Sequence, residues 1–174
     1  MFPLLFEPIR LGKIESRNRI LMPALGTLFS TDQKLNERHV RFYERRAEGG
    51  AGIIVAGPVG VDFVGSGAIT LSLREDAFIP DFKALADRVH AQGAKIMVQL
   101  FHGGRYTFSF MIEGQQSIAP SAVRSRYTGE EPREMTLEDI EQVQDAFAQG
   151  ARRSREAGID GVEIIGSAGY LISQ

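Results

Sequence analysis

Apolar residues follow two different patterns along the chain. Short, nearly continuous apolar runs are typical of parallel strands covered on both faces, and apolar positions three and four apart are typical of one face of a helix. The pattern predicts strands over residues 19–24, 51–57, 94–100 and 161–165, and helices over about 36–48, 80–91 and 137–156.

Glycines and one capping pattern mark where the helices begin and end. Gly50, Gly93 and Gly158 each follow a helical stretch directly before a strand, as a left-handed C-terminal cap requires. Thr136 and Asp139 occupy the positions of a capping box at the start of the third helix. The chain therefore repeats a helix, glycine, strand unit.

Alternating strands and helices predict a parallel sheet with right-handed crossovers, which is either a doubly wound sheet or a (β/α)8 barrel. The connections before helices are long (25–35, 58–79 and 101–135), whereas those after helices are short. This asymmetry favours a TIM barrel whose functional loops follow the strands. The segment EPIRLGKIESRN, with Gly12 and Lys13 at its turn, predicts a hairpin at the opposite end.

The strand count predicts only half of such a barrel. A complete barrel has eight strands in about 250 residues, and four are predicted here in 174 residues. We interpret residues 1–174 as one unit, the N-terminal half of a TIM-barrel domain. Its open edges are expected to be covered either by a missing C-terminal half or by a second copy of the chain.

Composition narrows the classes of function. A net charge of −2 without a basic cluster excludes a nucleic-acid or anionic-membrane surface. The absence of cysteine excludes thiolate chemistry and cysteine-ligated metal, and no metal site is predicted. No leader or membrane-spanning stretch is evident, so we expect a cytoplasmic protein. The glycine-rich VGVDFVGSGA lacks the strand and helix that a nucleotide-binding loop requires.

Four motifs stand at predicted strand ends: RNRILMPAL, VAGPVG, QLFHGGRY and VEIIGSAGYLISQ. In order and content they resemble the old yellow enzyme family of NADH:flavin oxidoreductases, most closely its 2,4-dienoyl-CoA reductase and bile-acid-inducible branch. The resemblance covers the whole chain as the first half of the FMN barrel. It implies FMN as cofactor, NADH or NADPH as reductant, and reduction of an activated C=C bond.

The resemblance also implies which residues bind the flavin. Gln99 would hydrogen-bond the pyrimidine edge, which displays donors and acceptors, although a capped polar residue at a strand end is the alternative. Pro23, Ala24 and Leu25 would lay their backbone along the ring. Gly57 would do the same, or would only permit a turn. Leu25 departs from the family, because many members have Thr or Cys at this position and leucine cannot donate a hydrogen bond.

Tyr170 matches the family's proton-donating tyrosine, and a structural tyrosine is the alternative. A phenol can protonate a carbon while hydride reaches the neighbouring carbon. Ile165 and Ala168 stand where typical members have two oxygen-binding side chains, His and His or Asn. The resembled dienoyl-CoA reductase branch also lacks this pair, so the resemblance implies a bulkier thioester or steroid-like substrate. Its oxygen would be held by backbone N–H groups around Gly166 or by the flavin ribityl hydroxyl.

Further polar residues receive less specific interpretations. His102 and Arg105 are predicted to line the substrate pocket, with an ion pair to an acidic loop residue as the alternative for Arg105. His39 and His90 are interpreted as surface residues. Glu163 is expected to have a basic partner across the barrel interior, because an unpaired buried carboxylate is costly.

Three functions remain open. The first is an FMN-dependent ene-reductase acting on a small molecule, with this chain inactive alone because the phosphate site of such barrels follows strands seven and eight. The second is a non-catalytic half-barrel that self-associates into a homo-oligomer. The third is a flavin-free barrel enzyme such as an aldolase or isomerase, which requires a lysine or carboxylate base at a strand end.

Overall fold

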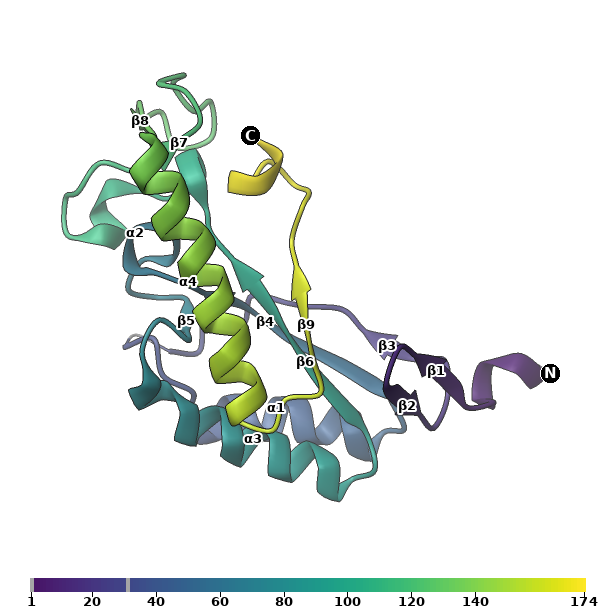
Figure 1. Cartoon of the computed structure of the whole chain (residues 1–174). Coiled ribbons are helices and arrows are strands. Elements are labelled where there is room, and N and C mark those ends of the chain that lie inside the picture. Colours follow the sequence, from purple (N-terminus) through teal and green to yellow (C-terminus); the bar gives the residue numbers. More distant parts are fainter. Residues whose placement is uncertain (1, 31) are drawn as a thin grey trace.

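The apolar runs form a curved parallel sheet (Figure 1). In the computed structural model, which describes residues 2–30 and 32–174, the strands lie in the order β3-β4-β6-β9. Their bounds are Leu21–Met22 (β3), Ile53–Gly60 (β4), Lys95–Phe101 (β6) and Gly161–Ile164 (β9). β5 (Leu71–Ser72) pairs with the end of β4, and each of these pairings is parallel.

Three long helices cover one face of this sheet (Figure 1). They are α1 (Glu37–Glu48), α3 (Ile79–Ala91) and α4 (Leu137–Glu156), and α2 (Phe63–Ser66) is a single short turn after β4. The apolar faces of α1 and α3 are buried, since Tyr43, Phe82 and Leu85 are fully inaccessible to solvent, whereas Ile140 of α4 is 39% exposed. Buried apolar residues of β4 and β6 complete this core.

The predicted helix boundaries are confirmed. Thr136 and Asp139 form the capping box of α4. The glycines after the three helices adopt φ of 103° (Gly50), 73° (Gly93) and 77° (Gly158), the left-handed region that glycine enters at little cost.

A second capping box at α1 corrects the interpretation of His39 as a surface residue. Asn36 caps the helix by accepting the His39 N–H, and the imidazole Nδ1 accepts the backbone N–H of Asn36. The side chain is 1% exposed. Burial, followed by the nearby Arg38 charge, lowers the pKa of His39 and favours the neutral ring that this acceptor role requires.

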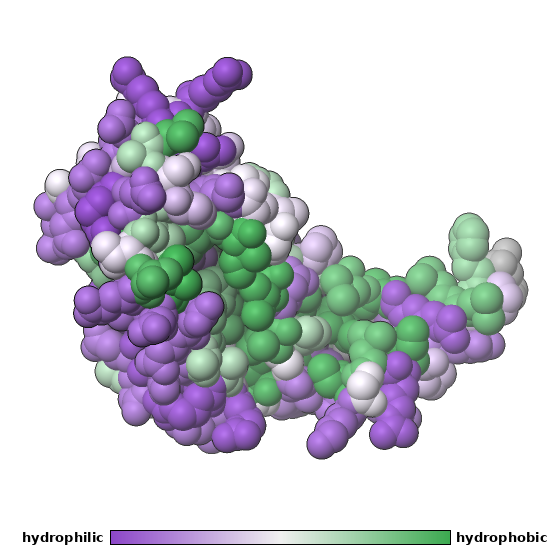
Figure 2. All heavy atoms as spheres, turned by 45° about the horizontal axis from the view of Figure 1, so that its top comes forward, coloured by the Kyte–Doolittle hydropathy of each residue, from purple (hydrophilic) through white to green (hydrophobic). Residues whose placement is uncertain are grey.

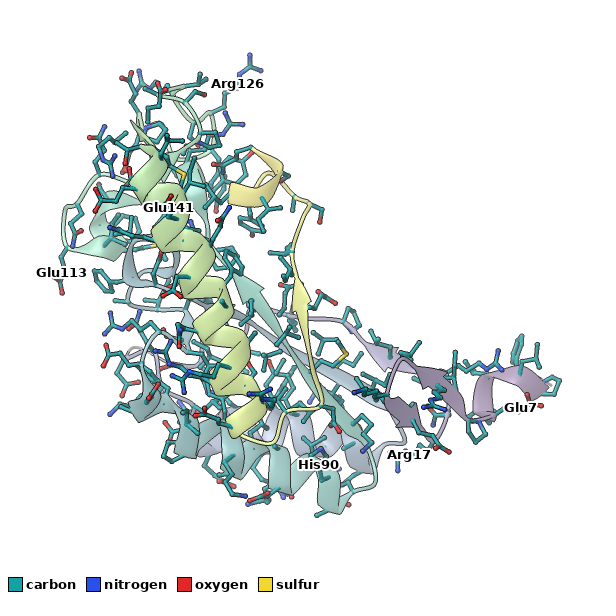
Figure 3. The ribbon with its side chains drawn as sticks, in the orientation of Figure 1. Glu7, Arg17, His90, Glu113, Arg126 and Glu141 are labelled. Carbon is teal, nitrogen blue, oxygen red and sulfur yellow. The ribbon has the colours of Figure 1, made fainter. Side chains whose placement is uncertain are left out.

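His90 also differs from its predicted surface role, because it belongs to a polar cluster at the N-terminal ends of the strands. Its Nε2 lies 2.7 Å from an oxygen of Asp160, which also pairs with Lys95 at 3.2 Å. In Figure 3, His90 and Arg126 lie at opposite ends of the molecule. His90 is therefore far from the loops that follow the strands.

The N-terminal hairpin forms as predicted, from β1 (Ile9–Leu11) and β2 (Ile14–Ser16). Ile14 lies against Gly161 at the start of β9. Next to the hairpin (Figure 3), Arg17 donates hydrogen bonds to three carbonyls, those of Gln92, Ala47 and Ala51. These bonds join the hairpin to the ends of α1 and α3.

The long connections gather at the other end, beyond the C-terminal ends of the strands (Figure 1). The longest contains the pair β7 (Ile118–Ala119) and β8 (Arg133–Glu134). Short 3-10 turns complete the chain, at Pro3–Phe6, Asp76–Phe78, Gly104–Tyr106, Ser109–Ile112 and Leu171–Ser173. The architecture is the first half of a (β/α)8 barrel, as the loop asymmetry predicted.

The concave side of the half-barrel exposes apolar surface, and Figure 2 shows hydrophobic residues gathered in this hollow. At the open edges of the sheet, Leu21 is 44% exposed and Ile164 is 52% exposed.

None of the helices in the described part of the chain has the length and apolar character that a membrane span requires.

Candidate functional site

Gly57 lies inside a strand, not at its end as predicted. β4 continues to Gly60, and its pairing with β6 shifts register between Ala56 and Val59. Gly57 adopts φ of 144°, and a Cβ there would lie 3.1 Å from the Cβ of Gln99. A side chain at Gly57 would be strained by this positive φ and would crowd Gln99 on the neighbouring strand.

The irregular strand is supported from the helix side. The N–H of Gly57 donates to the hydroxyl of Tyr43 at 3.2 Å. Burial raises the pKa of Tyr43, despite the opposing effects of this hydrogen bond and of Arg46, and so favours the neutral phenol. Tyr43 thus fixes the backbone of Gly57 from beneath the sheet.

Gln99 and Glu163 form a pair on adjacent strands. They stand opposite each other in the β6–β9 register, and the Gln99 amide Nε2–H₂ donates to Oε1 of Glu163. Among the described residues the partner of Glu163 is this amide, and the basic partner across the barrel interior stays a prediction. A neutral donor on the next strand satisfies the carboxylate because parallel strands bring side chains at matched positions together.

Tyr170 lies beside the end of the strand that carries Gln99. Its ring packs edge to face on Phe101, with ring centroids 4.7 Å apart, and on Tyr106 at 6.1 Å. Gln99 and Phe101 are two positions apart on β6, so both side chains leave the same face of the strand. The structure thus brings the phenol and the amide to one end of one face.

The turn before Tyr170, residues 166–169, contains two consecutive residues with positive φ. Ala168 and Gly169 have φ of 61° and 80°, and consecutive residues of this kind direct successive N–H groups toward one side. Among the described residues, the N–H groups of residues 166–169 have no hydrogen-bond acceptor. Ile165 is half-buried and Ala168 is exposed, and neither side chain can donate a hydrogen bond.

His102 is buried behind the loop, which differs from the pocket-lining position predicted for it. Its Nδ1 accepts the Gly104 N–H at 3.0 Å, and its Nε2 faces Asp62 at 3.3 Å with an angle outside hydrogen-bond geometry. Burial by itself raises the pKa of Asp62, but His102 and the Gly65 N–H outweigh it and lower that pKa. Asp62 is therefore ionised at neutral pH, and the cluster supports the loop from within.

Arg105 lies at the start of the long loop that follows β6. Within residues 2–30 and 32–174 no acidic side chain pairs with it, and its Nε is buried without a partner. It lines a cavity of about 160 Å³ together with Tyr106, Val123, Arg124 and Arg126. The alternative of an ion pair to an acidic loop residue is therefore wrong for the described residues, and the role in substrate binding stays a prediction.

Pro23, Ala24 and Leu25 follow β3 directly, at the edge of the sheet. Leu25 is 52% exposed and Pro23 is also exposed, while Ala24 is half-buried. They are separated from Gln99 by β4, which carries Gly57 between them. The five predicted flavin-binding residues therefore lie on three neighbouring strands or directly after them.

Three further residues support this site and were not predicted: Tyr43, Asp62 and Gln174. No local pattern around Tyr43 signals its hydrogen bond with Gly57, and none around Asp62 signals its contact with His102. Gln174 belongs to a quoted motif, but two of its three partners lie about seventy positions earlier. Within the described residues no group of three His, Asp or Glu could hold a metal ion.

Comparison with known proteins gives consistent matches over the whole chain. A 45% identical relative is the "Metal reductase" of Desulforamulus reducens, with 98% of this chain and 25% of the relative aligned. The "NADPH dehydrogenase" of Geobacillus sp. strain WCH70 is 36% identical, with 100% of this chain and 51% of the relative aligned. The chain thus spans between a quarter and half of the length of these relatives.

Solved structures share the fold. A 2-naphthoyl-CoA reductase complex is 30% identical with a TM-score of 0.92, and the alignment covers 99% of this chain and 28% of that one. The old yellow enzyme homologue from Zymomonas mobilis is 32% identical with a TM-score of 0.85, covering 97% and 50%. The NADH:flavin oxidoreductase / NADH oxidase family matches residues 4–174. The chain belongs to this family, whose cofactor is FMN and whose reductant is NADH or NADPH.

Proposed function

We propose that the chain forms the N-terminal half of an FMN-dependent ene-reductase. The observation that carries the proposal is that Tyr170 and Gln99 share one end of one face of the sheet. When bound, FMN would supply the hydride chemistry, with NADH or NADPH as the reductant and an electron-poor C=C bond as the acceptor.

The residues present fit a flavin ring. One N–H of the Gln99 amide is taken by Glu163, which leaves its carbonyl and its second N–H for a ring edge that displays both donors and acceptors. Gly57 is buried and adds no side chain beside the Gln99 amide. Pro23, Ala24 and Leu25 offer an apolar strip, and Leu25 adds no polar contact to the flavin.

Tyr170 would act as the proton donor. As hydride reaches one carbon of the C=C bond, the phenol hydroxyl gives its proton to the neighbouring carbon, and water then restores the hydroxyl. The ring contacts with Phe101 and Tyr106 hold the side chain in place. No hydrogen bond to another described residue occupies the Tyr170 hydroxyl.

The turn before Tyr170 favours a substrate with a carbonyl oxygen. The N–H groups of residues 166–169 without acceptors form a set of donors that could bind an oxygen on which negative charge develops. They would replace the side chains that Ile165 and Ala168 lack. We therefore propose enoyl or dienoyl thioesters, or steroid-like enones, as substrates, with Arg105 as a further contact to the substrate.

The test requires a completed barrel, defined as this chain joined after Gln174 to the part of the Geobacillus NADPH dehydrogenase that follows the matched region. The expected product is yellow, binds FMN, and reduces a crotonyl thioester or 2-cyclohexenone with NADH or NADPH. A folded but colourless completed barrel would contradict the proposal.

Tyr170→Phe tests the proton donor in the completed barrel. Reduction of the bound flavin by NADPH should stay within about twofold, and reoxidation by the enone should slow by about 10²- to 10⁴-fold, the usual contribution of a positioned acid. Stopped-flow absorbance at the flavin band separates the two steps. Tyr127→Phe, at an exposed loop tyrosine, is the matched control. Full turnover by Tyr170→Phe would contradict the assignment of Tyr170 as proton donor.

The exposed concave surface supports a second candidate, a non-catalytic half-barrel that self-associates. Sedimentation of the 174-residue chain with FMN added distinguishes the two, because a colourless oligomer favours self-association. A flavin-free barrel enzyme is disfavoured because the family uses FMN.

A further inference from the structure

The side chain of Gln174 joins the two loops that carry the most specific motifs. Its Nε2 donates to the carbonyls of Gly169 at 2.7 Å and Gly103 at 3.2 Å. Its Oε1 accepts the backbone N–H of Arg105 at 3.1 Å. One half-buried amide therefore forms hydrogen bonds with three backbone groups. One lies in the turn before Tyr170, and two lie in the HGGRY loop, residues 102–106.

Glycines make room for this amide. At Gly104, which has φ of 59°, a Cβ would lie 2.2 Å from Oε1 of Gln174. At Gly169, a Cβ would lie 2.8 Å from the ring of Tyr106. Both loops thus lack side chains where they approach each other, and the Leu171 N–H donates to the His102 carbonyl at 3.1 Å as a further link.

The amide also has the functional groups that this position requires. Two carbonyls demand a donor with two N–H bonds, and one N–H demands an acceptor. A glutamate could only accept and would place charge against two carbonyl oxygens. Asparagine is one methylene shorter, and methionine fills the space without donating.

We propose that Gln174 is a positioning residue that sets the Tyr170 ring against the HGGRY loop. The inference rests on the proposed role of Tyr170 as proton donor. Because Tyr170 packs between Phe101 and Tyr106, and Tyr106 covers Gly169, a shift of either loop moves the phenol relative to the substrate. Loss of the three hydrogen bonds should therefore weaken proton transfer and leave hydride entry into the flavin unchanged.

The test uses Gln174→Met, Gln174→Glu and Gln174→Asn in the completed barrel, loaded with FMN. Flavin reduction by NADPH should stay within about twofold, and reoxidation by the enone should slow by about 10- to 100-fold, as expected for misplacement of a reacting group by about 1 Å. Gln116→Met is the matched control, because Gln116 is an exposed loop glutamine with one backbone hydrogen bond. The control should leave both steps unchanged.

A double variant decides whether Gln174 acts through Tyr170. With Tyr170→Phe already present, Gln174→Met should slow reoxidation no further, because residues that act as a unit are not additive. Equal slowing of both half-reactions, or additive losses in the double variant, would overturn the proposal. Failure of all three Gln174 variants to fold, with Gln116→Met folded, would also overturn it by making Gln174 a general stability residue.

A measurement without flavin separates this inference from the proposed function. Hydrogen exchange of the Arg105 amide in the completed barrel should accelerate by about tenfold or more in Gln174→Met, as expected when one hydrogen bond of about 1.4 kcal/mol is lost. A colourless barrel with this acceleration would contradict the ene-reductase and keep the contact between the loops. Unchanged exchange would contradict the contact itself.

Discussion

Glu163 stands opposite Gln99 on the adjacent strand. Its hydrogen bond with the Gln99 amide fixes which end of that amide faces the open side of the sheet, because an ionised carboxylate can only accept. An unpaired amide could rotate and exchange its donor and acceptor ends. Glu163 therefore sets the orientation of the Gln99 amide, which in the proposed function faces the flavin edge.

The first prediction at this scale concerns FMN affinity. Glu163→Met in the completed barrel should raise the Kd of FMN by about tenfold, the equivalent of one hydrogen bond of about 1.4 kcal/mol. Glu163→Gln should raise it less, since its carbonyl still accepts. Quenching of FMN fluorescence measures the Kd, and a Glu163→Met barrel with unchanged affinity would show that Gln99 needs no such partner.

A double-mutant cycle with Gln99→Met completes the prediction. If Glu163 acts through Gln99, its substitution should have almost no effect on the Kd once the amide is removed. Additive effects would instead indicate a separate influence of the carboxylate charge on the flavin.

At the scale of elements, α1 and α3 are joined by a network centred on Glu44. Arg88 binds its carboxylate through two hydrogen bonds of 2.6 and 2.8 Å, and Arg41 adds another. The hydrogen bonds from Arg88, then those from Arg41, lower the pKa of Glu44 from 4.5 to about 2. Its carboxylate therefore stays ionised in the folded protein after it would be protonated in the unfolded chain.

The pH dependence follows from that lowered pKa. Between pH 4.5 and about 2, the unfolded state binds more protons at Glu44 than the folded state, so the stabilisation present above pH 4.5 declines as pH falls through this window. Glu44→Gln should lower the urea midpoint at pH 7, and the difference from the unsubstituted protein should shrink toward pH 2. Glu48→Gln, at an exposed pair on the same helix, is the control, and a difference independent of pH would contradict the prediction.

The two capping boxes show how far local sequence predicts such elements. Thr136 and Asp139 follow the usual pattern, so the start of α4 is readable from the sequence. Asn36 uses a histidine at the third helical position. An imidazole accepts a backbone N–H only through an unprotonated nitrogen. Burial favours the neutral ring at His39, and the local sequence does not specify that burial.

At the scale of the whole molecule, the described part of the half-barrel has exposed apolar surface. Besides the concave side (Figure 2) and its edges, the N-terminal turn exposes Phe2 at 77% and Phe6 at 65%. Surface of this kind associates with other apolar surface in water. The second half of the barrel or another copy of the chain is the expected partner.

The prediction at this scale is an association that depends on concentration. The 174-residue chain should sediment as dimers or larger species whose proportion rises with concentration, and Ile164→Glu should shift it toward monomer, since a charge on an apolar interface is costly. The completed barrel should remain unaffected by concentration over the same range. A chain that stays monomeric at all concentrations would contradict the prediction.

The sequence alone determined the alternation of strands and helices, the glycine ends of the helices, the hairpin and the family. These features depend on residues that are neighbours in the chain and on short continuous motifs. The extent of β4 beyond Gly57, the burial of His39, the partner of Glu163 and the clustering around Gln174 were decided only by the tertiary structure. Gln99 is 64 positions from Glu163, and Gly103 is 71 positions from Gln174. Hydrogen bonds across such separations exist only after the parallel strands have set their register and curvature, which no local pattern specifies.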